Sequence, residues 1–344
     1  MSSISIIIPH YNGWEVLDEC LSSLHKTEGI DNFEIIVVDN SSSDDSIIKA
    51  KKKYSLISIV SSAKNLGYSG GCNLGARKAK GKFLVFLNND TIMEKNWLKI
   101  LEKKINSNSN IASVQPKIKN FYKKSQFDYA GGSGGYIDLF CFPFVRGRIF
   151  DSLENDCCQY DNSCPIFWAS GTAFITRKSL FDQIGGFDET MFMHMEEIDY
   201  HWKSQLLGYS VWIEPMSVIY HKGGATLAYS SPLKTYFNHR NSLILLLTNY
   251  NVLVSLILFL PRLLMELVAF IRYFLSGKLN HSFAQLKAWI WIIFNPHIII
   301  KRYKSLSKLR KNNKMILETI YNNSIVYQYF IKNKKTYKNL FKGS

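Results

Sequence analysis

The chain has 344 residues, of which 47% are hydrophobic and 20% are charged, an ordinary composition for a protein that builds a core. Its length predicts two domains, or one large domain with an appendage. The net charge is +15, and residues 301–344 contribute twelve Lys or Arg against the single acid Glu318. Because this basic end follows a very apolar region, it favours an anionic membrane surface over nucleic acid as the partner.

Four short β-rich runs near the N-terminus predict buried parallel strands. Each is an almost continuous apolar run, as expected for a strand covered on both faces. The runs are SISIIIP (3–9), FEIIVVD (33–39), LISIVSS (56–62) and KFLVFLN (82–88). Helical patterns lie between them, at 14–24, 46–54 and 71–80. This alternation predicts an α/β domain with a mostly parallel central sheet and right-handed crossovers.

Polar residues follow three of these runs, where the sequence reads PHYN, VDNSSSD and LNND. Ligands of parallel sheets bind outside the carboxyl ends of the strands. Asn, Asp and Ser are also favoured in turns and helix caps, so one such end alone would be uninformative. Three such polar strand ends in one predicted sheet favour a nucleotide site. The Asp39 carboxylate can accept from the imide N–H of uracil or thymine, whereas Asp44 or Asp45 suits a helix cap.

A glycine-rich segment, KNLGYSGGCNLGARKAKG, opens the third helix. Its glycines at 67, 70, 71 and 75 fit neither GxGxxG nor GxxxxGK[ST], which argues against a dinucleotide fingerprint or a P-loop. Glycines nevertheless let a backbone approach a ligand closely, and a helix N-terminus suits a diphosphate. The segment is therefore a weak indication of a diphosphate site.

The stretch FLNND delivers Asn88, Asn89 and Asp90 to the edge of the sheet. A carboxylate at this place can hold a divalent cation, which in turn neutralises a diphosphate. Asn89 can support the cation through its carbonyl or a water. A helix cap at Asp90 is the alternative interpretation.

Residues 105–165 are less regular and include the tight-turn segment YAGGSGG (129–135). A structured loop over a pocket and a plain insertion explain this region about equally well. The six cysteines form no CxxC pair, and the N-terminus reads as a strand rather than a signal peptide. We therefore expect reduced thiols in a cytosolic protein.

Three carboxylates stand among methionines and aromatic residues in MFMHMEEIDYHW (191–202). Burying Glu196, Glu197 and Asp199 in such surroundings is costly, so the stretch is either a solvated helix face or the site of a sheltered catalytic base. On a helix, Glu196 and Glu197 point about 100° apart and rarely share one role. Upstream, Trp168 suits either a sugar-stacking platform or the core.

From Leu243 to Ile300 the chain is very apolar but interrupted by polar residues. It contains no uninterrupted apolar run of eighteen, so a clean transmembrane helix is not predicted. Tryptophans followed by the basic run HIIIKRYKSLSKLRKNNK favour helices that lie in the membrane interface, with a buried capping pair as the alternative. We expect a catalytic domain over 1–242 and a helical extension over 243–344.

Six motifs in order resemble the family 2 glycosyltransferases of GT-A fold, most closely their rhamnosyltransferase-like branch. They are IIIPHYNG, IIVVDNSSSD, NLGYSGGCNLG, FLNND, SGTAFITRKSLFDQIGGFDETMFMHMEEID and HKGGAT. The resemblance covers roughly residues 3–245. It implies an inverting enzyme that uses a nucleotide-diphosphate sugar and a divalent cation, Mg²⁺ or Mn²⁺.

The same resemblance assigns residues to four groups. The nucleotide-sugar site takes Pro9, Tyr11, Asn12, Asp39, Asn65, Gly67, Asn73 and Asn89. The metal takes Asp90 and His221, and the acceptor side takes Trp168 and Asp199. The pair Glu196–Glu197 matches the family's Glu-Asp pair, whose second member is the usual base, so Glu197 is the predicted base and Glu196 its rival.

Two positions depart from the family pattern. The DxD metal motif reads Asn88-Asn89-Asp90, which leaves one strong metal ligand and makes dependence on a metal less certain. The base position holds Glu197 rather than Asp, and the extra methylene requires a slightly different placement of the acceptor hydroxyl or of the backbone.

The resemblance implies transfer of a sugar from dTDP-rhamnose or a UDP-hexose. With the apolar and basic end of the chain, it predicts a hydroxyl of a lipid-linked surface glycan as the acceptor, at the inner face of the cell membrane. The base must lie within hydrogen-bond reach of that hydroxyl, and its apolar shelter should raise its pKa. A nucleotidyltransferase-like or merely sugar-nucleotide-binding protein is the alternative. Nucleotidyltransferases usually carry a glycine-rich Arg-Lys signature near the N-terminus, which PHYNGWEV lacks.

Overall fold

The structure is a computed structural model that describes residues 3–223, 231–310 and 317–341. Its first half contains a parallel sheet in the order β3-β2-β1-β4. The strands are β1 (Ile4–His10), β2 (Glu34–Asp39), β3 (Ile57–Ser61) and β4 (Phe83–Leu87), joined by helices α1 (Trp14–Leu24), α2 (Ser46–Lys53) and α3 (Gly67–Lys78). All four predicted strands are present, each within one residue of its expected ends.

Helix α3 begins at Gly67, earlier than predicted, so the glycines lie inside the helix rather than in a turn before it. The helix packs against β1 and β2 at very short range. A Cβ added at Gly75 would lie 2.5 Å from Ile7 Cγ2 and 2.8 Å from Val38 Cγ2. Gly75 therefore has no room for a side chain, because α3 packs so closely on the sheet.

Beyond β4 the sheet becomes mixed. Strand β12 (Ala173–Arg177) lies antiparallel between β4 and β6 (Ile111–Asn120), and β13 (Ser210–His221) runs parallel to β6. The short strands β5 (Thr91–Met93) and β11 (Cys164–Ile166) both pair antiparallel with β13. The predicted mostly parallel α/β sheet is thus confirmed in its first half and extended by antiparallel strands in its second.

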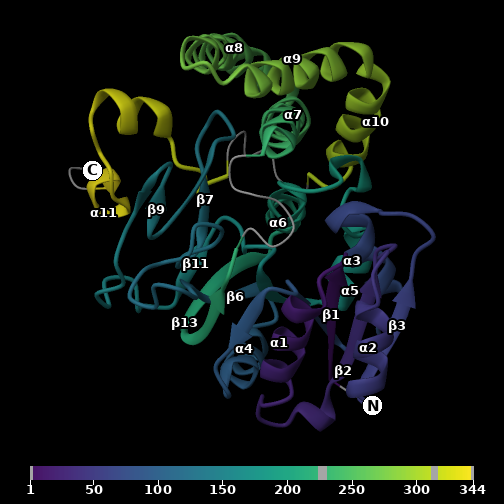
Figure 1. Cartoon of the computed structure of the whole chain (residues 1–344). Coiled ribbons are helices and arrows are strands. Elements are labelled where there is room, and N and C mark those ends of the chain that lie inside the picture. Colours follow the sequence, from purple (N-terminus) through teal and green to yellow (C-terminus); the bar gives the residue numbers. More distant parts are fainter. Residues whose placement is uncertain (1–2, 224–230, 311–316, 342–344) are drawn as a thin grey trace.

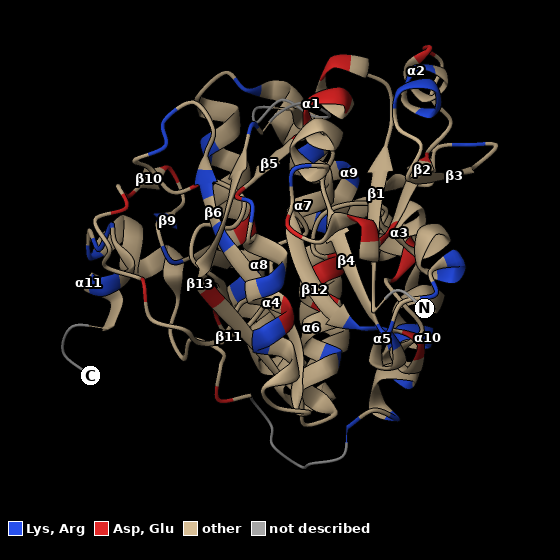
Figure 2. Ribbon diagram, turned by 90° about the horizontal axis from the view of Figure 1, so that it is seen from below, with Lys and Arg blue, Asp and Glu red and all other residues tan. Residues whose placement is uncertain are grey.

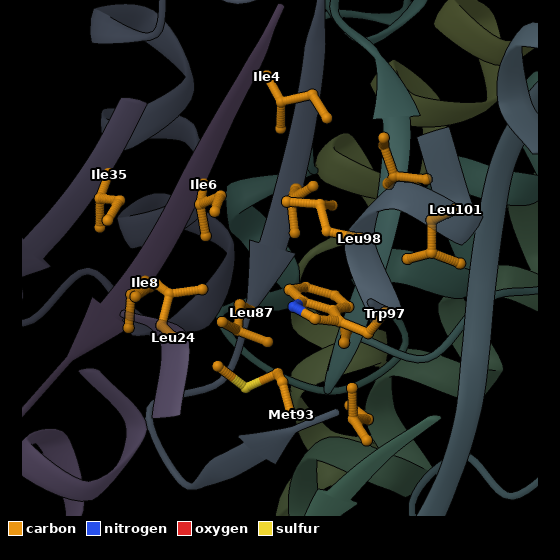
Figure 3. Packing of buried hydrophobic residues seen from close by; sticks show 14 of the residues in the cluster. Ile4, Ile6, Ile8, Leu24, Ile35, Leu87, Met93, Trp97, Leu98 and Leu101 are labelled. Atoms are coloured by element: carbon orange, nitrogen blue, oxygen red, sulfur yellow. The ribbon is translucent and has the colours of Figure 1, made fainter. Parts of the chain in front are cut away.

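Two hydrophobic layers cover the sheet. On one face α1 and α4 (Trp97–Asn106) pack on alternate residues of β1 and β4, as the cluster of Ile6, Leu24, Leu87, Trp97 and Leu98 in Figure 3 shows. On the other face α3, α5 (Lys178–Ile184) and α6 (Glu196–Leu206) cover the intervening residues. Burial on both faces explains the continuous apolar runs.

The irregular region forms a small antiparallel sheet of its own, in the order β10-β9-β8-β7. Its strands are β7 (Gly135–Ile137), β8 (Pro143–Val145), β9 (Arg148–Ile149) and β10 (Ser152–Leu153). The end of the chain packs against it through η3 (Tyr327–Ile331) and α11 (Tyr337–Phe341). Asp138 Oδ2 accepts from the backbone N of Ile325 at 2.9 Å. Much of the predicted basic tail therefore returns to the catalytic part of the protein.

Four long helices follow β13 in the described chain: α7 (Pro232–Asn249), α8 (Val252–Leu275), α9 (Leu279–Phe294) and α10 (Pro296–Ser307). We call α8 and α9 the outer layer. Figure 1 shows α8 and α9 at the edge of the molecule farthest from β1 and β2, with α7 beneath them. The expected boundary between residues 242 and 243 falls inside α7.

By length and composition alone, α8 is apolar enough to cross a membrane, and α9 with α10, bent by 72°, would be a second candidate.

Candidate active site

The carboxyl ends of β1 and β2 form the first part of the site, with His10 beside Asp39 in the sheet register. The loops that follow are joined by side chains. Asn12 Oδ1 accepts from Ser43 N at 2.8 Å, and Asp39 Oδ1 accepts from Ser42 N at 2.8 Å. Pro9 and Tyr11 lie at the same end of the sheet, and the Tyr11 side chain is 43% exposed.

Asn40 is a site residue that sequence reasoning missed. Its buried amide donates to Gly67 O at 2.9 Å and to Asn65 Oδ1 at 3.2 Å, and its oxygen accepts from Leu66 N at 2.8 Å. Asn65 Oδ1 also accepts from Gly67 N at 2.8 Å. Asn65 and Gly67 are predicted to contact the nucleotide sugar. The Asn40 side chain thereby holds them close to the residue next to it, Asp39. In the sequence Asn40 was indistinguishable from a turn residue.

Asn73 faces a different part of the molecule. Its amide oxygen accepts from Phe187 N at 2.9 Å, and its nitrogen donates to Phe187 O at 2.8 Å and to Glu189 Oε1 at 3.0 Å. It braces α3 against the segment that leads to the acid pair. Its predicted contact with the donor stays a prediction.

Asn89 supports the tip of β1 through a buried histidine. Its amide nitrogen lies 2.8 Å from His10 Nδ1, and His10 Nε2 lies 2.8 Å from Ser46 Oγ. Burial lowers the pKa of His10 to about 4, against the opposing effect of Asp44 and Asp39. His10 is therefore a neutral connector between β4, β1 and α2, a role that the sequence alone did not indicate.

Asp90 and His221 do come together, as predicted from positions far apart in the sequence. His221 Nε2 lies 3.1 Å from Asp90 Oδ1, and its Nδ1 lies 3.0 Å from Asp128 Oδ1. Burial acts to lower the pKa of His221, but Asp90 and Asp128 outweigh it and raise that pKa to about 10. Asp128 was missed because it lies in the irregular region. The Gly224–Thr226 part of HKGGAT lies outside the described residues.

The side chains of Asp90 and His221 fit a divalent cation whose other ligands come from a diphosphate. Within the residues that the structure covers, no group of three or more His, Cys, Asp or Glu side chains is arranged to hold a metal ion. Mg²⁺, however, is commonly bound by one or two carboxylates together with substrate phosphates. Asp128 behind His221 repeats the carboxylate–histidine arrangement that orients metal-binding imidazoles.

The acid pair stands at the first turn of α6, after a loop with positive φ at Phe192, His194 and Met195. Glu196 is 3% exposed, whereas Glu197 is half-buried. Burial raises the pKa of Glu197 to about 7. Burial together with the neighbouring Glu197 raises the pKa of Glu196 well above its usual range.

A short bridge joins the acid pair to the tip of β4. The backbone N of Gly171 donates to Glu197, and the next residue, Thr172, accepts from Asn88 N at 2.9 Å. Gly171 O in turn accepts from Tyr68 Oη of α3 at 2.5 Å. The predicted metal motif, the glycine-rich helix and the acids therefore surround one place.

The two predicted acceptor-side residues are both buried. Asp199 Oδ1 accepts from Asn249 Nδ2 at 2.9 Å and from Arg302 Nη2 at 3.0 Å, and its Oδ2 lies 2.6 Å from Lys203 Nζ. These partners make Asp199 a buried brace between α6, α7 and α10, and its predicted contact with the acceptor stays a prediction. Trp168 is 4% exposed and donates to Tyr136 O at 2.8 Å, which corresponds to the core alternative for this residue.

Comparison with known families identifies the chain. The model of the family described as glycosyl transferase family 2 matches residues 5–185, more than half of the sequence. The chain belongs to glycosyl transferase family 2. The predicted resemblance is thereby confirmed.

Relatives of this family 2 glycosyltransferase are distant. A low-salt glycan biosynthesis hexosyltransferase of Haloferax volcanii is 26% identical over 70% of this chain and 74% of its own length. An uncharacterized glycosyltransferase of Rickettsia felis is 28% identical over 53% of this chain, but the match spans only 28% of that protein. An N-acetylglucosaminyl-diphospho-decaprenol L-rhamnosyltransferase of Mycobacterium tuberculosis is 40% identical over 18% of this chain and 20% of its own.

Solved structures confirm the fold of this glycosyltransferase. A mannosyltransferase of Pyrobaculum calidifontis, determined with GDP-Man and Mn²⁺, covers 89% of this chain and 84% of its own with a TM-score of 0.52 at 15% identity. GalNAc-T7, determined with UDP, GalNAc and Mn²⁺, covers 64% of this chain and 43% of its own with a TM-score of 0.53 at 18% identity. The predicted GT-A fold is thus confirmed.

Proposed function

We propose that this family 2 glycosyltransferase transfers a sugar from a nucleotide-diphosphate donor to a hydroxyl of a glycan, with inversion and with Glu197 as the general base. The arrangement of Glu197 is the main support. It is half-buried, has a pKa raised to about 7, and is tied through Gly171 and Thr172 to the tip of β4. A base with a pKa near the working pH is well matched to proton abstraction.

An inverting transfer is a single displacement at the anomeric carbon. Glu197 takes the proton of the acceptor hydroxyl as its oxygen attacks, and the bond to the diphosphate breaks on the opposite side. Asp39 and Asn65 hold the nucleotide, because they lie at the joined ends of β2 and α3. Glu196, which is more deeply buried beside Tyr68 and Cys72, keeps its proton and orients Glu197.

Asp90, together with His221 once its imidazole has lost the proton that Asp90 and Asp128 favour, would hold a divalent cation beside the donor diphosphate. Such a cation would neutralise the negative charge that develops on the leaving group. The fit of this donor set and the Mn²⁺ present with two structural neighbours support the assignment.

The donor is proposed to be dTDP-rhamnose or a UDP-hexose, and the acceptor a lipid-linked surface glycan. One relative is named as a rhamnosyltransferase of N-acetylglucosaminyl-diphospho-decaprenol, and another as a hexosyltransferase of glycan biosynthesis. A lipid-linked acceptor agrees with the apolar layer of α8 and α9, which would associate with the anionic inner face of the cell membrane.

The decisive experiment measures nucleotide release from dTDP-, UDP- and GDP-sugars with a lipid-diphosphate-linked acceptor, with and without Mn²⁺. We expect one donor to be used and Glu197→Gln to lower its turnover by about 10²-fold or more, since that is the usual contribution of a general base. Glu214→Gln, on β13, is the matched control. Near-normal turnover of Glu197→Gln would disprove the base assignment. Donor binding with no transfer or hydrolysis would indicate a binding protein.

A further inference from the structure

Helix α8 has its polar and apolar faces reversed relative to a helix of a soluble protein. Between residues 252 and 271 every exposed side chain is aliphatic, and each is at least 41% exposed. These side chains are Val252, Leu253, Leu256, Ile257, Leu260, Leu264, Leu267, Val268 and Ile271. The residues that α8 buries include Ser255, Arg262 and Glu266. Such a face requires an apolar partner.

The buried side of α8 fixes its rotation about the helix axis. Arg262 Nη2 lies 2.6 Å from Glu266 Oε1 and 2.8 Å from Ser242 Oγ of α7. Glu266 Oε2 lies 2.7 Å from His239 Nδ1 of α7 and accepts from Gln285 Nε2 of α9 at 2.8 Å. Because these charges sit in the middle of the helix, pulling α8 out to cross a bilayer alone would leave them in hydrocarbon.

The exposed charged side chains in this part of the described chain are all cationic. Helix α9 continues that face with exposed Phe283, Ile290 and Ile293. The exposed charged residues of the surrounding segment are Arg272, Lys278, Lys287, Lys301, Lys304 and Lys308. Glu266 is the sole Asp or Glu between residues 231 and 310, and it is fully buried. In contrast, both signs of charge occur on α4 (Figure 2).

This charge pattern decides between partners. Two copies of the chain that met through this face would bring identical cationic rims together, whereas anionic phospholipids complement them. We infer that α8 lies in the plane of one leaflet of an anionic bilayer, with its aliphatic face among the acyl chains and Arg272, Lys278 and Lys287 among the headgroups. The inference rests on the membrane association proposed above and specifies how it occurs.

Depth measurements test this orientation. Nitroxide labels would be placed singly at Ile257→Cys and Ile271→Cys, about 21 Å apart along the helix, and at Ile48→Cys on α2 as a control. The background replaces the cysteines outside the core, Cys157, Cys158 and Cys164, with Ser. On phosphatidylglycerol vesicles we expect the two α8 labels to lie at the same shallow depth in the bilayer. The α2 label should stay outside the bilayer.

A depth difference of about 20 Å between the α8 labels would overturn the in-plane orientation while leaving membrane association intact. Absence of flotation with the vesicles would instead refute the association itself. Labels that are already shielded in a dimer without vesicles would identify a second copy of the chain as the partner.

A second observation concerns the loop before the acid pair. Asn241 Nδ2 of α7 lies 3.0, 2.9 and 2.7 Å from the carbonyl oxygens of Met191, Met193 and His194. Arg240 Nη2 donates to Thr190 O at 2.7 Å, and its Nε donates to Asn241 Oδ1 at 2.9 Å. Two neighbouring side chains of α7 thus hold most of the backbone carbonyls of this loop.

The loop needs this support because its conformation is unfavourable. Phe192, His194 and Met195 have φ of 62°, 64° and 73°, values that bulky residues rarely adopt. They lie directly before Glu196 and Glu197, so their backbone sets the direction in which both acids point. The geometry points to Asn241 as a positioning residue for the catalytic acids, under the proposed function.

The test compares Asn241→Leu, which removes the amide donor at similar volume without adding a charge, with Asn238→Leu on the same helix. For Asn241→Leu we expect kcat to fall at least tenfold, the donor KM to stay unchanged, and the midpoint of the pH–rate profile to move below 7 as water reaches Glu197.

An unchanged pH midpoint, or a loss of activity that merely follows a loss of folded protein, would overturn the positioning role. Lack of transfer by the unmodified enzyme would refute the proposed function instead.

Discussion

At the scale of single residues, the site separates two adjacent acids by their surroundings. Glu196 is almost fully buried near Tyr68 and Cys72, whereas Glu197 is half-buried and accepts from Gly171 N. A hydrogen bond between the two carboxyl groups lowers the pKa of Glu197 and raises that of Glu196. The pair therefore binds one proton, which resides on Glu196.

The first prediction concerns the pH dependence of transfer. Glu197 must be ionised to act as a base, and burial raises its pKa to about 7. We therefore expect kcat/KM to fall about tenfold per pH unit below 7 and to reach a plateau above it. A profile measured between pH 5 and 9 with saturating Mn²⁺ checks this. A midpoint near 4.5 would indicate a base exposed to water.

The second prediction separates the role of Glu196 from that of Glu197. Because Glu196 donates a hydrogen bond that favours the ionised form of Glu197, Glu196→Ala should move the midpoint of the pH–rate profile upward. Glu196→Gln keeps a donor and should leave the midpoint close to that of the unmodified enzyme. Abolition of turnover in Glu196→Gln at every pH would identify Glu196 as the base.

At the scale of elements, the carboxyl edge of the sheet is built by close packing of α3 on β1 and β2. Gly75 allows this approach, which brings Asn65 and Gly67 to Asn40. The parallel strands were predictable because strands buried on both faces have continuous apolar runs. Strand β12 and the pairing of β13 with β6 were not, since they depend on contacts between residues far apart in the chain.

The same distinction applies to the site. Asp90 and His221 were found from motifs, whereas Asp128, His10 and Asn241 were not, because only the folded chain brings them to their partners. Each of them acts by hydrogen-bonding to another group rather than by belonging to a motif. In the described structure, Asn73 and Trp168 likewise donate hydrogen bonds to backbone carbonyl groups far away in the sequence.

The third prediction tests the packing of α3. A methyl group at Gly75 would collide with Ile7 and Val38, so Gly75→Ala should lower the free energy of unfolding by about 1–3 kcal/mol despite the better helix propensity of Ala. Urea unfolding measures this. Lys78→Ala, at the exposed end of the helix, is the control and should be close to neutral. A stabilised Gly75→Ala variant would contradict the close approach.

At the scale of the whole molecule, the chain leaves the catalytic part, forms the outer helices and returns. Residues 317–341 pack on the small sheet of β7–β10, with Tyr329 near Ser152 and Lys335 Nζ 3.6 Å from the centre of the Tyr329 ring. The basic end is thus divided. The lysines of α10 are exposed, whereas the last segment packs on the small sheet through apolar and aromatic residues and leaves Lys332 and Lys338 exposed.

The fourth prediction concerns this return. Asp138 accepts from the backbone N of Phe140, Phe142 and Ile325, all within 2.9 Å. Asp138→Ala leaves these donors without their acceptor and should cost about 2–4 kcal/mol of stability. We also expect faster tryptic cleavage between residues 332 and 338, detected by mass spectrometry. Asp151→Ala, exposed nearby, should change neither.

The 72° bend between α9 and α10 has a consequence for the length of the acceptor. Helix α10 starts at the outer layer, and Arg302, about 9 Å along it, already contacts Asp188 and Asp199 beside the acids. With α8 and α9 resting on lipid, as proposed above, α10 would set the height of Glu197 above the bilayer. The enzyme would then act as a ruler, extending glycans whose free hydroxyl lies at that height and passing over shorter or longer ones.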